Sequence, residues 1–277
     1  ITAISLILTA FWTIPVIRLI GFGLRGDAGT QLAQSGGLEL TDFIRFFYPH
    51  FKSRFIPASA AVFIGVLSFL LAIACFLLPK KNKTVKFFIF LVILTFLFSF
   101  KYSPIFWLFP HLPIFNLFRS PAKFWLDGIF ALIILAGFGL DNLEVIKELP
   151  RFKKYVKILK IFAISVLGLV LAANLVTFFL KSKIINLATW FFDKYLYFKT
   201  TRAPLEYYHQ IITEIFNQST QLISFTNPRF LVALIFTLIS ILFLIFYHRG
   251  RSKVLVRNFK IIALIIIVLN LLLFWKV

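Results

Sequence analysis

The chain has 277 residues, of which 60% are hydrophobic and 14% are charged, and its formal net charge is +20 at pH 7. A soluble domain would not carry so large an apolar share, because average usage is about 45–50% apolar and 25% charged residues. A basic excess in a soluble chain would indicate nucleic-acid binding, but here the basic residues lie in short links between apolar blocks, which favours a membrane protein with no nucleic-acid partner.

The apolar blocks approach or exceed the roughly 20 residues that cross a 30 Å hydrocarbon core. Because backbone groups in lipid must bond to one another, such blocks form helices. The sequence therefore predicts an all-α, polytopic integral membrane protein with about seven transmembrane helices and structured extracytoplasmic loops. The predicted spans are, in chain order, Ile1–Ile20, Ala58–Leu78, about Thr84–Tyr102, Phe124–Leu140, Ile158–Leu180, Phe230–Tyr247 and Phe259–Trp275.

The connections between these spans differ in their content of Lys and Arg. The basic links are 79–86, 141–160 and 248–260, and the outer segments are 21–57, 101–123 and 181–228. The basic links hold 15 basic residues in 41 positions, whereas the outer segments hold 12 in 108. Since Lys and Arg accumulate in cytoplasmic loops, the basic links are predicted to be cytoplasmic and the outer segments extracytoplasmic.

The outer segment 101–123 is too proline-rich for a regular span and too apolar for an ordinary loop. It carries Pro104, Pro110, Pro113 and Pro121 among aromatic residues. Non-helical backbone at membrane depth is stable only against protein or a water-filled cavity. We therefore expect a structured re-entrant or interfacial segment that forms one wall of a site.

The outer segment 181–228 contains two apolar patterns. Residues 184–196 are rich in aromatic side chains and are expected to lie in the membrane interface. Further along, apolar residues recur at helical spacing and predict a helix that packs over the outer ends of the spans. The residues of this face are Leu205, Tyr208, Ile212, Ile215 and Leu222.

Neither the glycine motif near the first span nor the single cysteine indicates a functional site. Residues 21–26 read GFGLRG and match the dinucleotide-binding pattern, which requires a strand before it and a helix after it. Here a span precedes the motif and a polar loop follows, so the glycines are interpreted as a flexible exit from the bilayer. Cys75 lies in an apolar run. The sequence assigns neither a cofactor nor a metal site, and it assigns no ligands for a divalent cation.

Charged residues near the predicted fourth span are candidates for function. Arg119 and Lys123 flank Pro121 and either hold a lipid phosphate or extend to the headgroups; the fixed proline backbone favours the phosphate role. Asp127 is the one acid within a predicted span. It is either a site acid or a helix-orienting partner of Lys123, four residues before it.

The remaining polar candidates have simpler interpretations. His50 and His111 face outward as substrate-contacting or interfacial histidines, and no carboxylate partner is assigned to either. Glu39 and Asp42 are interpreted as a solvated loop face. Asn174 and Asn270 lie deeper in their spans and are expected to form hydrogen bonds between helices. Those two asparagines are therefore not expected to bind a ligand.

Several segments in the first half of the chain resemble a known family. The segment from Ser103 to Phe124, which ends in LPIFNLFRSPAKF, resembles a signature of the YfhO family of bacterial integral membrane proteins, which are related to GT-C glycosyltransferases. Members carry a proline-aromatic stretch leading into Arg-x-Pro-x-Arg before a span with an Ala/Gly-rich end. That end reads LAGFGL at 135–140 here, and the pieces FWTIP at 11–15 and FYPHF at 47–51 occur in the family's order. The resemblance covers about residues 1–145.

The resemblance implies transfer of a sugar from a polyprenyl-phosphate carrier to an extracytoplasmic acceptor, such as a cell-envelope glycopolymer, at the cytoplasmic membrane of a bacterium. Arg119 and Lys123 match the family's two basic positions, with Lys replacing the second Arg, which weakens a two-oxygen phosphate contact. The family's catalytic acid lies in a first outer loop near the N-terminus. We expect that loop upstream of Ile1, in a longer protein, so no catalytic residue is assigned to this chain.

The predicted organisation is a YfhO-like region over 1–145 with about four spans and a C-terminal region over 146–277 with about three. The expected partners are membrane lipids, the polyprenyl-phosphate donor and the glycopolymer acceptor. The first alternative is a non-catalytic protein, either a lipid-linked sugar transporter or an envelope assembly scaffold, and the second is an unrelated structural membrane protein. A transporter typically has helices broken at mid-depth, whereas the interruptions here lie at the outer surface, which favours the transferase.

Overall fold

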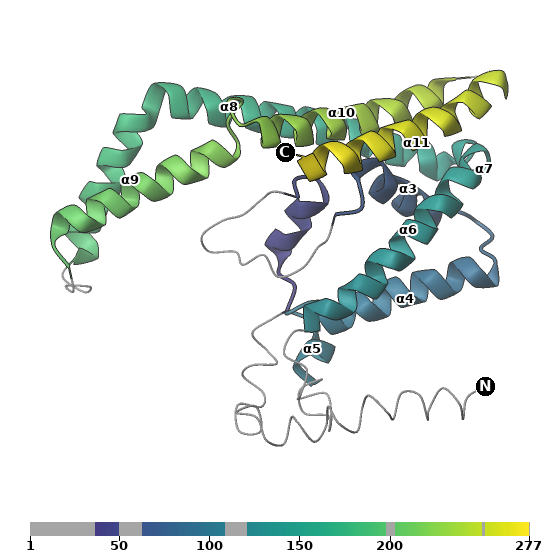
Figure 1. Ribbon diagram of the computed structural model, residues 1–277, viewed down its shortest axis with the longest axis horizontal. Coiled ribbons are helices and arrows are strands. Elements are labelled where there is room, and N and C mark those ends of the chain that lie inside the picture. The colour runs from purple at the N-terminus through teal and green to yellow at the C-terminus, as the bar shows by residue number, and fades with distance from the viewer. Residues whose placement is uncertain (1–36, 50–62, 109–120, 198–202, 251–252, 277) are drawn as a thin grey trace. The chain divides into compact units, whose positions relative to one another are not determined.

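The computed structural model describes residues 37–49, 63–108, 121–197, 203–250 and 253–276 (Figure 1). Within these residues all regular secondary structure is helical, and one isolated bridge joins Leu38 to Phe100. The all-α prediction is therefore confirmed for the described part of the chain. The first predicted span, Ile1–Ile20, lies outside the described residues.

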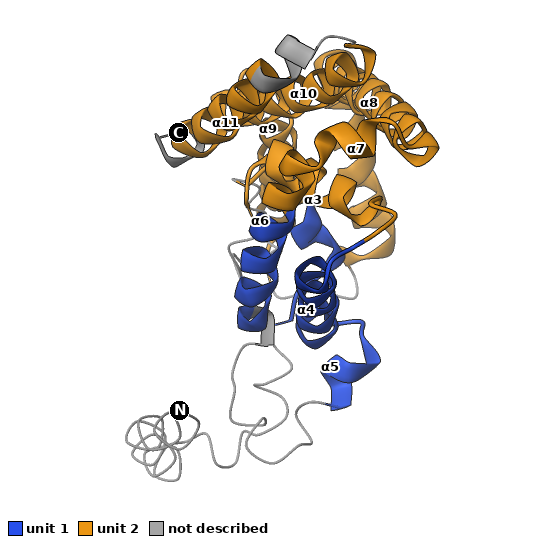
Figure 2. Ribbon diagram, turned by 90° about the vertical axis from the view of Figure 1, so that its right-hand side faces the viewer, with its two compact units in different colours: residues 1–43, 58–62, 81–135 blue, residues 44–57, 63–80, 136–277 orange. Residues whose placement is uncertain are grey.

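The chain divides into two compact units, coloured separately in Figure 2. Unit 1 comprises residues 1–43, 58–62 and 81–135, and unit 2 comprises residues 44–57, 63–80 and 136–277. Each unit therefore combines segments that are distant in the sequence, and each is described by itself below.

Unit 1 is built on the helix α4 (Lys83–Ser99). Asn82 caps its first turn, where the side chain accepts a hydrogen bond from Val85 N at 2.7 Å. The helix α6 (Trp125–Asp141) begins in this unit and packs against α4 through Phe96 and Trp125, whose ring centroids are 6.0 Å apart. The spans predicted at about Thr84–Tyr102 and at Phe124–Leu140 are therefore both confirmed as helices, each with 17 residues and about 26 Å long.

The helix α3 (Val66–Phe76) forms the centre of unit 2. Eight of its eleven residues are buried, and it packs against α7, α10 and α11. Gly65 precedes it with a φ of 85°, a left-handed backbone that ends the helix on this side. The prediction of one continuous span over 58–78 is therefore wrong, because the helix starts only at Val66.

The helices α7 (Leu143–Lys147) and α8 (Pro150–Tyr195) replace the predicted linker at 141–160. Pro150 suits the first turn of a helix, where its missing N–H is not needed. Phe152, Val156 and Leu159 are buried on one face of α8, so the adjacent basic residues stay outside. The predicted end at Leu180 is also wrong, since residues 181–195 contain no proline or glycine and the helix continues.

Two helices, α8 and α10 (Pro228–Arg249), are long and apolar enough to cross a membrane, judged by length and composition. In α8 only 6% of the most apolar 18-residue window is buried, whereas a core helix of a soluble protein is mostly buried. Phe178 is 82% exposed and Leu169 is 71% exposed. This exposure is consistent with membrane association, while the seven-span arrangement stays a prediction.

The helix α9 (Leu205–Leu222) confirms the helix predicted in the outer segment 181–228. It packs against the C-terminal part of α8, as Figure 1 shows. Each residue of the predicted apolar face is partly buried, whereas Glu206 and Gln218 are exposed. At the other end of α9, Asn174 Nδ2 donates to Ile223 O at 3.0 Å, so the expectation that Asn174 joins helices is confirmed.

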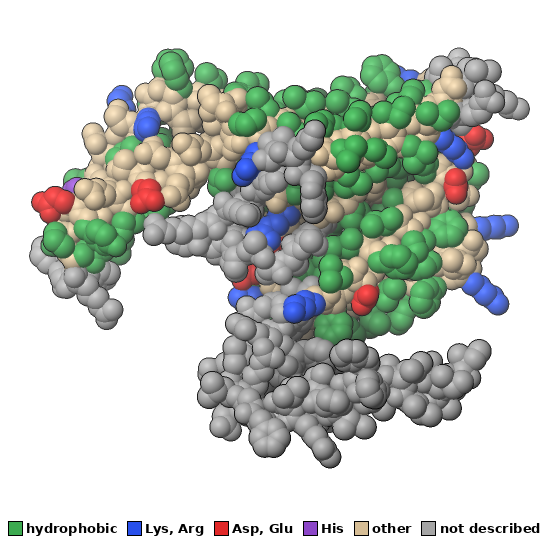
Figure 3. Space-filling model, viewed as in Figure 1, with side chains coloured by type: hydrophobic (Ala, Val, Ile, Leu, Met, Phe, Trp, Pro, Cys, Tyr) green, Lys and Arg blue, Asp and Glu red, His purple; other side chains and the backbone are tan. Residues whose placement is uncertain are grey.

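The helix α11 (Lys253–Lys276) packs against α10 and α3. Its exposed side chains over residues 261–273 are apolar, and Figure 3 shows hydrophobic groups spread over this face of unit 2. On its inner side, Asn270 is 2% exposed and its Oδ1 accepts a hydrogen bond from Val66 N at 3.3 Å. The second asparagine prediction is therefore also confirmed.

Candidate functional site

Parts of two predicted outer segments meet at the C-terminal end of α4 in unit 1. Leu38 N donates to Ser99 O at 2.7 Å, and Lys101 N donates to Leu38 O at 2.9 Å. The short helix α5 (Pro104–Leu108) and the 3-10 turn η4 (Pro121–Phe124) pack against α4 as well. We call this group of segments the outer junction. It joins the outer segments 21–57 and 101–123 through their described residues.

Two charged side chains of the outer junction, Lys101 and Glu39, form an ion pair. Lys101 Nζ lies 2.9 Å from Glu39 Oε1, and both side chains are 40% exposed. Asp42 is only 3% exposed, and its Oδ2 accepts from Glu39 N at 2.9 Å. The expectation of a solvated face is therefore wrong for Asp42, because its carboxylate reaches back to Glu39, the residue just before the 3-10 turn η1 (Leu40–Phe46).

An aromatic wall stands beside this ion pair. Phe96 and Phe100 are stacked with ring centroids 4.8 Å apart, and Phe43 lies 5.9 Å and 6.1 Å from them. Phe106 of α5 is fully buried, and a Cβ on Gly37 would lie 2.7 Å from its ring. Apolar walls with a few polar groups are typical of sites for small amphipathic ligands.

Two of the predicted site residues fall within the described residues, and both are exposed: Lys123 in η4 and Asp127 in the first turn of α6. Within the described residues no ion pair joins them, so the predicted pairing of Asp127 with Lys123 is not observed. Asp127 instead occupies a helix N-terminus, where a negative charge is stabilised. Arg119, His111 and His50 lie outside the described residues.

In unit 2, a second contact joins the outer segments 21–57 and 181–228. Asn227 Nδ2 donates to Tyr48 Oη at 3.3 Å, and the ring of Tyr48 packs edge-on against Phe230 at 5.7 Å. Burial raises the pKa of Tyr48, so its hydroxyl stays protonated. Asn227 also caps α10 through Arg229 N at 3.0 Å. One asparagine therefore starts α10 and attaches the first outer segment to it.

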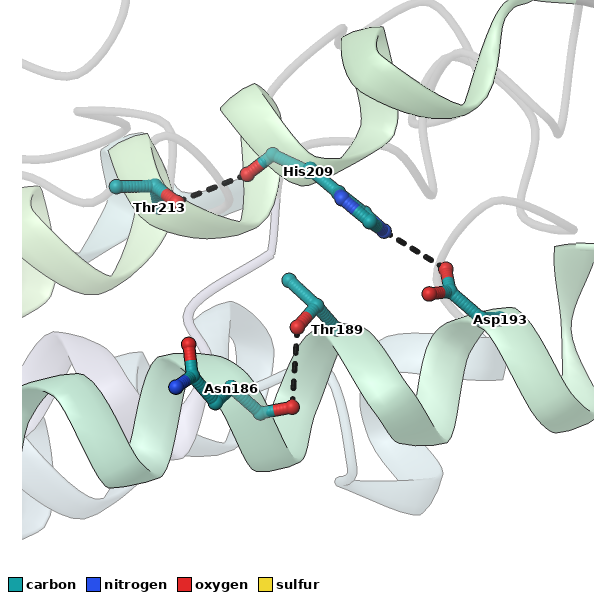
Figure 4. A network of polar contacts seen from close by, with 5 residues as sticks. All are labelled: Asn186, Thr189, Asp193, His209 and Thr213. Atoms are coloured by element: carbon teal, nitrogen blue, oxygen red, sulfur yellow. Dashed lines mark hydrogen bonds and ion pairs between the residues drawn. The ribbon is translucent and has the colours of Figure 1, made fainter.

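A histidine–carboxylate contact that the sequence did not indicate joins α8 to α9 (Figure 4). His209 Nε2 lies 2.8 Å from Asp193 Oδ1, and the two side chains are 36% and 38% exposed. Beside them, the rings of Phe192 and Tyr208 are 5.0 Å apart. A carboxylate can orient a general base, but the aromatic packing shows that this surface holds the hairpin together. The one local signal was the helical face that contains Tyr208.

We expect the His209–Asp193 contact to contribute about 0.5 kcal/mol to stability, because partly exposed pairs are screened by water. A double-mutant cycle with Asp193→Asn and His209→Gln measures this coupling as a free energy of unfolding. The matched control is the more open pair Lys260–Asp141, whose Nζ and Oδ1 atoms are 3.7 Å apart, and its coupling is expected to be smaller. A coupling above about 2 kcal/mol would contradict this account and indicate a buried, preorganised site.

The described side chains of the outer junction can therefore offer an exposed cation, Lys123, and an aromatic wall, but no catalytic pair. Among the described residues no group of three or more His, Cys, Asp or Glu side chains is placed to hold a metal ion. What the site can do follows from its own residues, because comparison of the chain with known family models, with curated proteins and with solved structures finds no match.

Proposed function

We propose that the chain is the seven-span membrane part of a GT-C-like glycosyltransferase of YfhO type in a bacterial cytoplasmic membrane. Its activity would move a sugar from a polyprenyl-phosphate carrier to an extracytoplasmic glycopolymer. The resemblance of residues 103–124 supports the chemistry. The contacts between connecting segments support the orientation on which that chemistry depends.

The single observation that carries the two-sided topology is that contacts join segments predicted to lie on the same side, whereas the Lys and Arg content indicates which side is cytoplasmic. Among the outer segments, Leu38 bonds to Ser99 and Lys101 within unit 1, and Tyr48 bonds to Asn227 within unit 2. Among the basic links, Lys147 Nζ donates to Gly250 O within unit 2. Lys260 Nζ lies 3.7 Å from Asp141 Oδ1 in the same unit. These pairings are what a two-sided membrane topology requires.

Arg119 and Lys123 would bind the lipid phosphate and stabilise the negative charge that grows on it as the sugar departs. Lys123 is suited to this role because it is exposed and, within the described residues, no acid pairs with it. The catalytic acid would come from the rest of the protein. In this proposal the aromatic wall of the outer junction contacts the apolar part of the carrier next to its phosphate.

The orientation is tested by labelling single cysteines with a membrane-impermeant reagent in intact and opened cells. The background is Cys75→Ser, and the reporters are Ser219→Cys on the exposed side of α9 and Lys154→Cys on α8. Both reporter positions are exposed. We expect Ser219→Cys to react in intact cells and Lys154→Cys only after opening. The reverse pattern would overturn the orientation and the outward-facing chemistry with it.

The site is tested by replacing Arg119 with alanine in the full-length protein. We expect sugar transfer to fall about a hundredfold at normal expression, because losing one group that stabilises developing charge costs about that factor. The matched control is Lys181→Ala, which removes an exposed basic residue of another outer segment and should change transfer less than about twofold. Unchanged transfer in the Arg119 variant would remove that residue from the site.

A further inference from the structure

The first three turns of α8 and the end of α10 enclose a basic pocket within unit 2. The pocket has a volume of about 440 Å³ and is lined by four lysines together with Pro150, Val156 and His248. The lysines are Lys153, Lys154, Lys157 and Lys160. They stand on one face of α8 because residues three and four apart are neighbours on a helix.

The positive charge of this pocket is not balanced by nearby acids. Residues 150–160 hold five basic residues and no Asp or Glu. Within the described residues no ion pair reaches the four lysines, and the α7 acids Glu144 and Glu148 form none. Nδ1 of His248 is buried and has no hydrogen-bond partner there. Like charges at this spacing repel one another, so an anion in the pocket would relieve a local cost.

An exposed apolar stripe continues from the pocket along the same face of α8. Ile161, Ile164, Leu171 and Leu175 follow Lys157 at spacings of four, three, seven and four residues, and they are 55%, 71%, 52% and 56% exposed. Gly168 lies between them, and an added Cβ there would meet nothing within 4 Å. A cluster of cations at the end of an exposed apolar stripe matches a molecule with an anionic head and hydrocarbon tails.

We propose that this basic pocket binds the phosphate headgroup of an anionic glycerophospholipid, with the acyl chains lying along the stripe from Ile161 to Leu175. Basic pockets between membrane helices on the cytoplasmic side bind such headgroups through Lys and Arg. The site lies on the predicted cytoplasmic side and is distinct from the outer junction. It rests on the membrane part of the proposed function and not on sugar transfer.

The test uses the full-length protein in nanodiscs of phosphatidylcholine, with phosphatidylglycerol added as the probe and its retention measured by native mass spectrometry. We expect Lys153→Gln with Lys157→Gln to weaken phosphatidylglycerol binding about 25-fold, since each lysine near an anionic surface contributes a factor of about five. The matched control replaces Lys83 and Lys86 by glutamine. These two lysines lie in another basic link and are exposed, and their loss should change binding less than about twofold.

Two further variants separate the possible outcomes. Lys153→Arg with Lys157→Arg should retain binding. This result would show that a loss of binding in the glutamine variant is not caused by misfolding. Ile164→Ser should weaken lipid binding without changing the charge. Equal losses of binding in the Lys153/Lys157 and Lys83/Lys86 variants would show that the lipid responds only to total charge. Displacement of the lipid by equimolar inorganic phosphate would show a site for free phosphate. Either result would overturn the proposal. Sugar transfer is assayed separately, so the lipid-binding result can still be interpreted if the transferase proposal fails.

Discussion

Replacing Gly139 with alanine is expected to destabilise the protein by about 2–4 kcal/mol, a large effect for the addition of one methyl group. Gly139 lies in α6 and is buried against α3 within unit 2. A Cβ at this position would lie 2.2 Å from the backbone oxygen of Leu71. The methyl group meets backbone and not the movable end of a side chain, so the helices must separate. Overpacking of this kind costs about 1–3 kcal/mol and sometimes more.

The matched control for this change is Gly137→Ala, two residues earlier on the same helix. A Cβ there would meet nothing within 4 Å. Alanine should therefore stabilise α6 by about 0.5–1 kcal/mol, because glycine loses more backbone entropy on forming a helix. Both free energies are measured by detergent-induced unfolding followed by helix content. Equal effects of the two substitutions would show that α6 and α3 do not approach closely at Gly139.

Replacing Asn270 with leucine is expected to cost about 1–3 kcal/mol. Its Oδ1 accepts a hydrogen bond from Val66 N at the start of α3, a helix whose other flanking groups offer no side-chain cap. Leucine has the same number of side-chain heavy atoms and the same branching at Cγ, but it would leave this buried N–H without its partner, and an unsatisfied buried donor carries the full cost of desolvation. We expect this lost free energy to appear as unfolding under milder conditions. In hydrogen exchange, α3 should be the first helix to exchange its amide hydrogens.

The control for this substitution is Asn258→Leu, which changes the same residue type in α11 at an exposed position. It should change stability by less than about 0.5 kcal/mol. Asn270→Asp provides a second check, because the carboxylate can still accept the hydrogen bond but brings a charge into a buried position. If the Asn270→Leu variant were as stable as the unchanged protein, the hydrogen bond between α11 and α3 would contribute nothing measurable to stability.

The candidate site was only partly predictable from the sequence. The exposed position of Lys123 in the proline-bounded turn follows from local signals, and Arg119 remains a proposal from the same stretch. The Glu39–Lys101 ion pair joins residues 62 positions apart, and the His209–Asp193 contact depends on the hairpin turn between two helices. The helical face that contains Tyr208 indicated α9 but not its partner, and neither pairing itself is visible locally, because charges distant in sequence meet only when the chain folds. The four lysines of the basic pocket lie in the stretch that was predicted as a basic cytoplasmic link, and the structure places them in the first turns of α8.

What the sequence determined by itself is the helical class and the position of several helices. Apolar runs bounded by Asn82, Pro204 or the pair Asn227-Pro228 became α4, α9 and α10, because caps and prolines act on the nearest turn of backbone. The tertiary structure decided which apolar faces are covered by protein. The runs that contain α3 and α8 are both strongly apolar, yet α3 is buried and α8 is exposed. Hydrophobicity by itself only favours removing an apolar helix face from water. Packing between distant segments determines whether protein or another apolar surface covers that face.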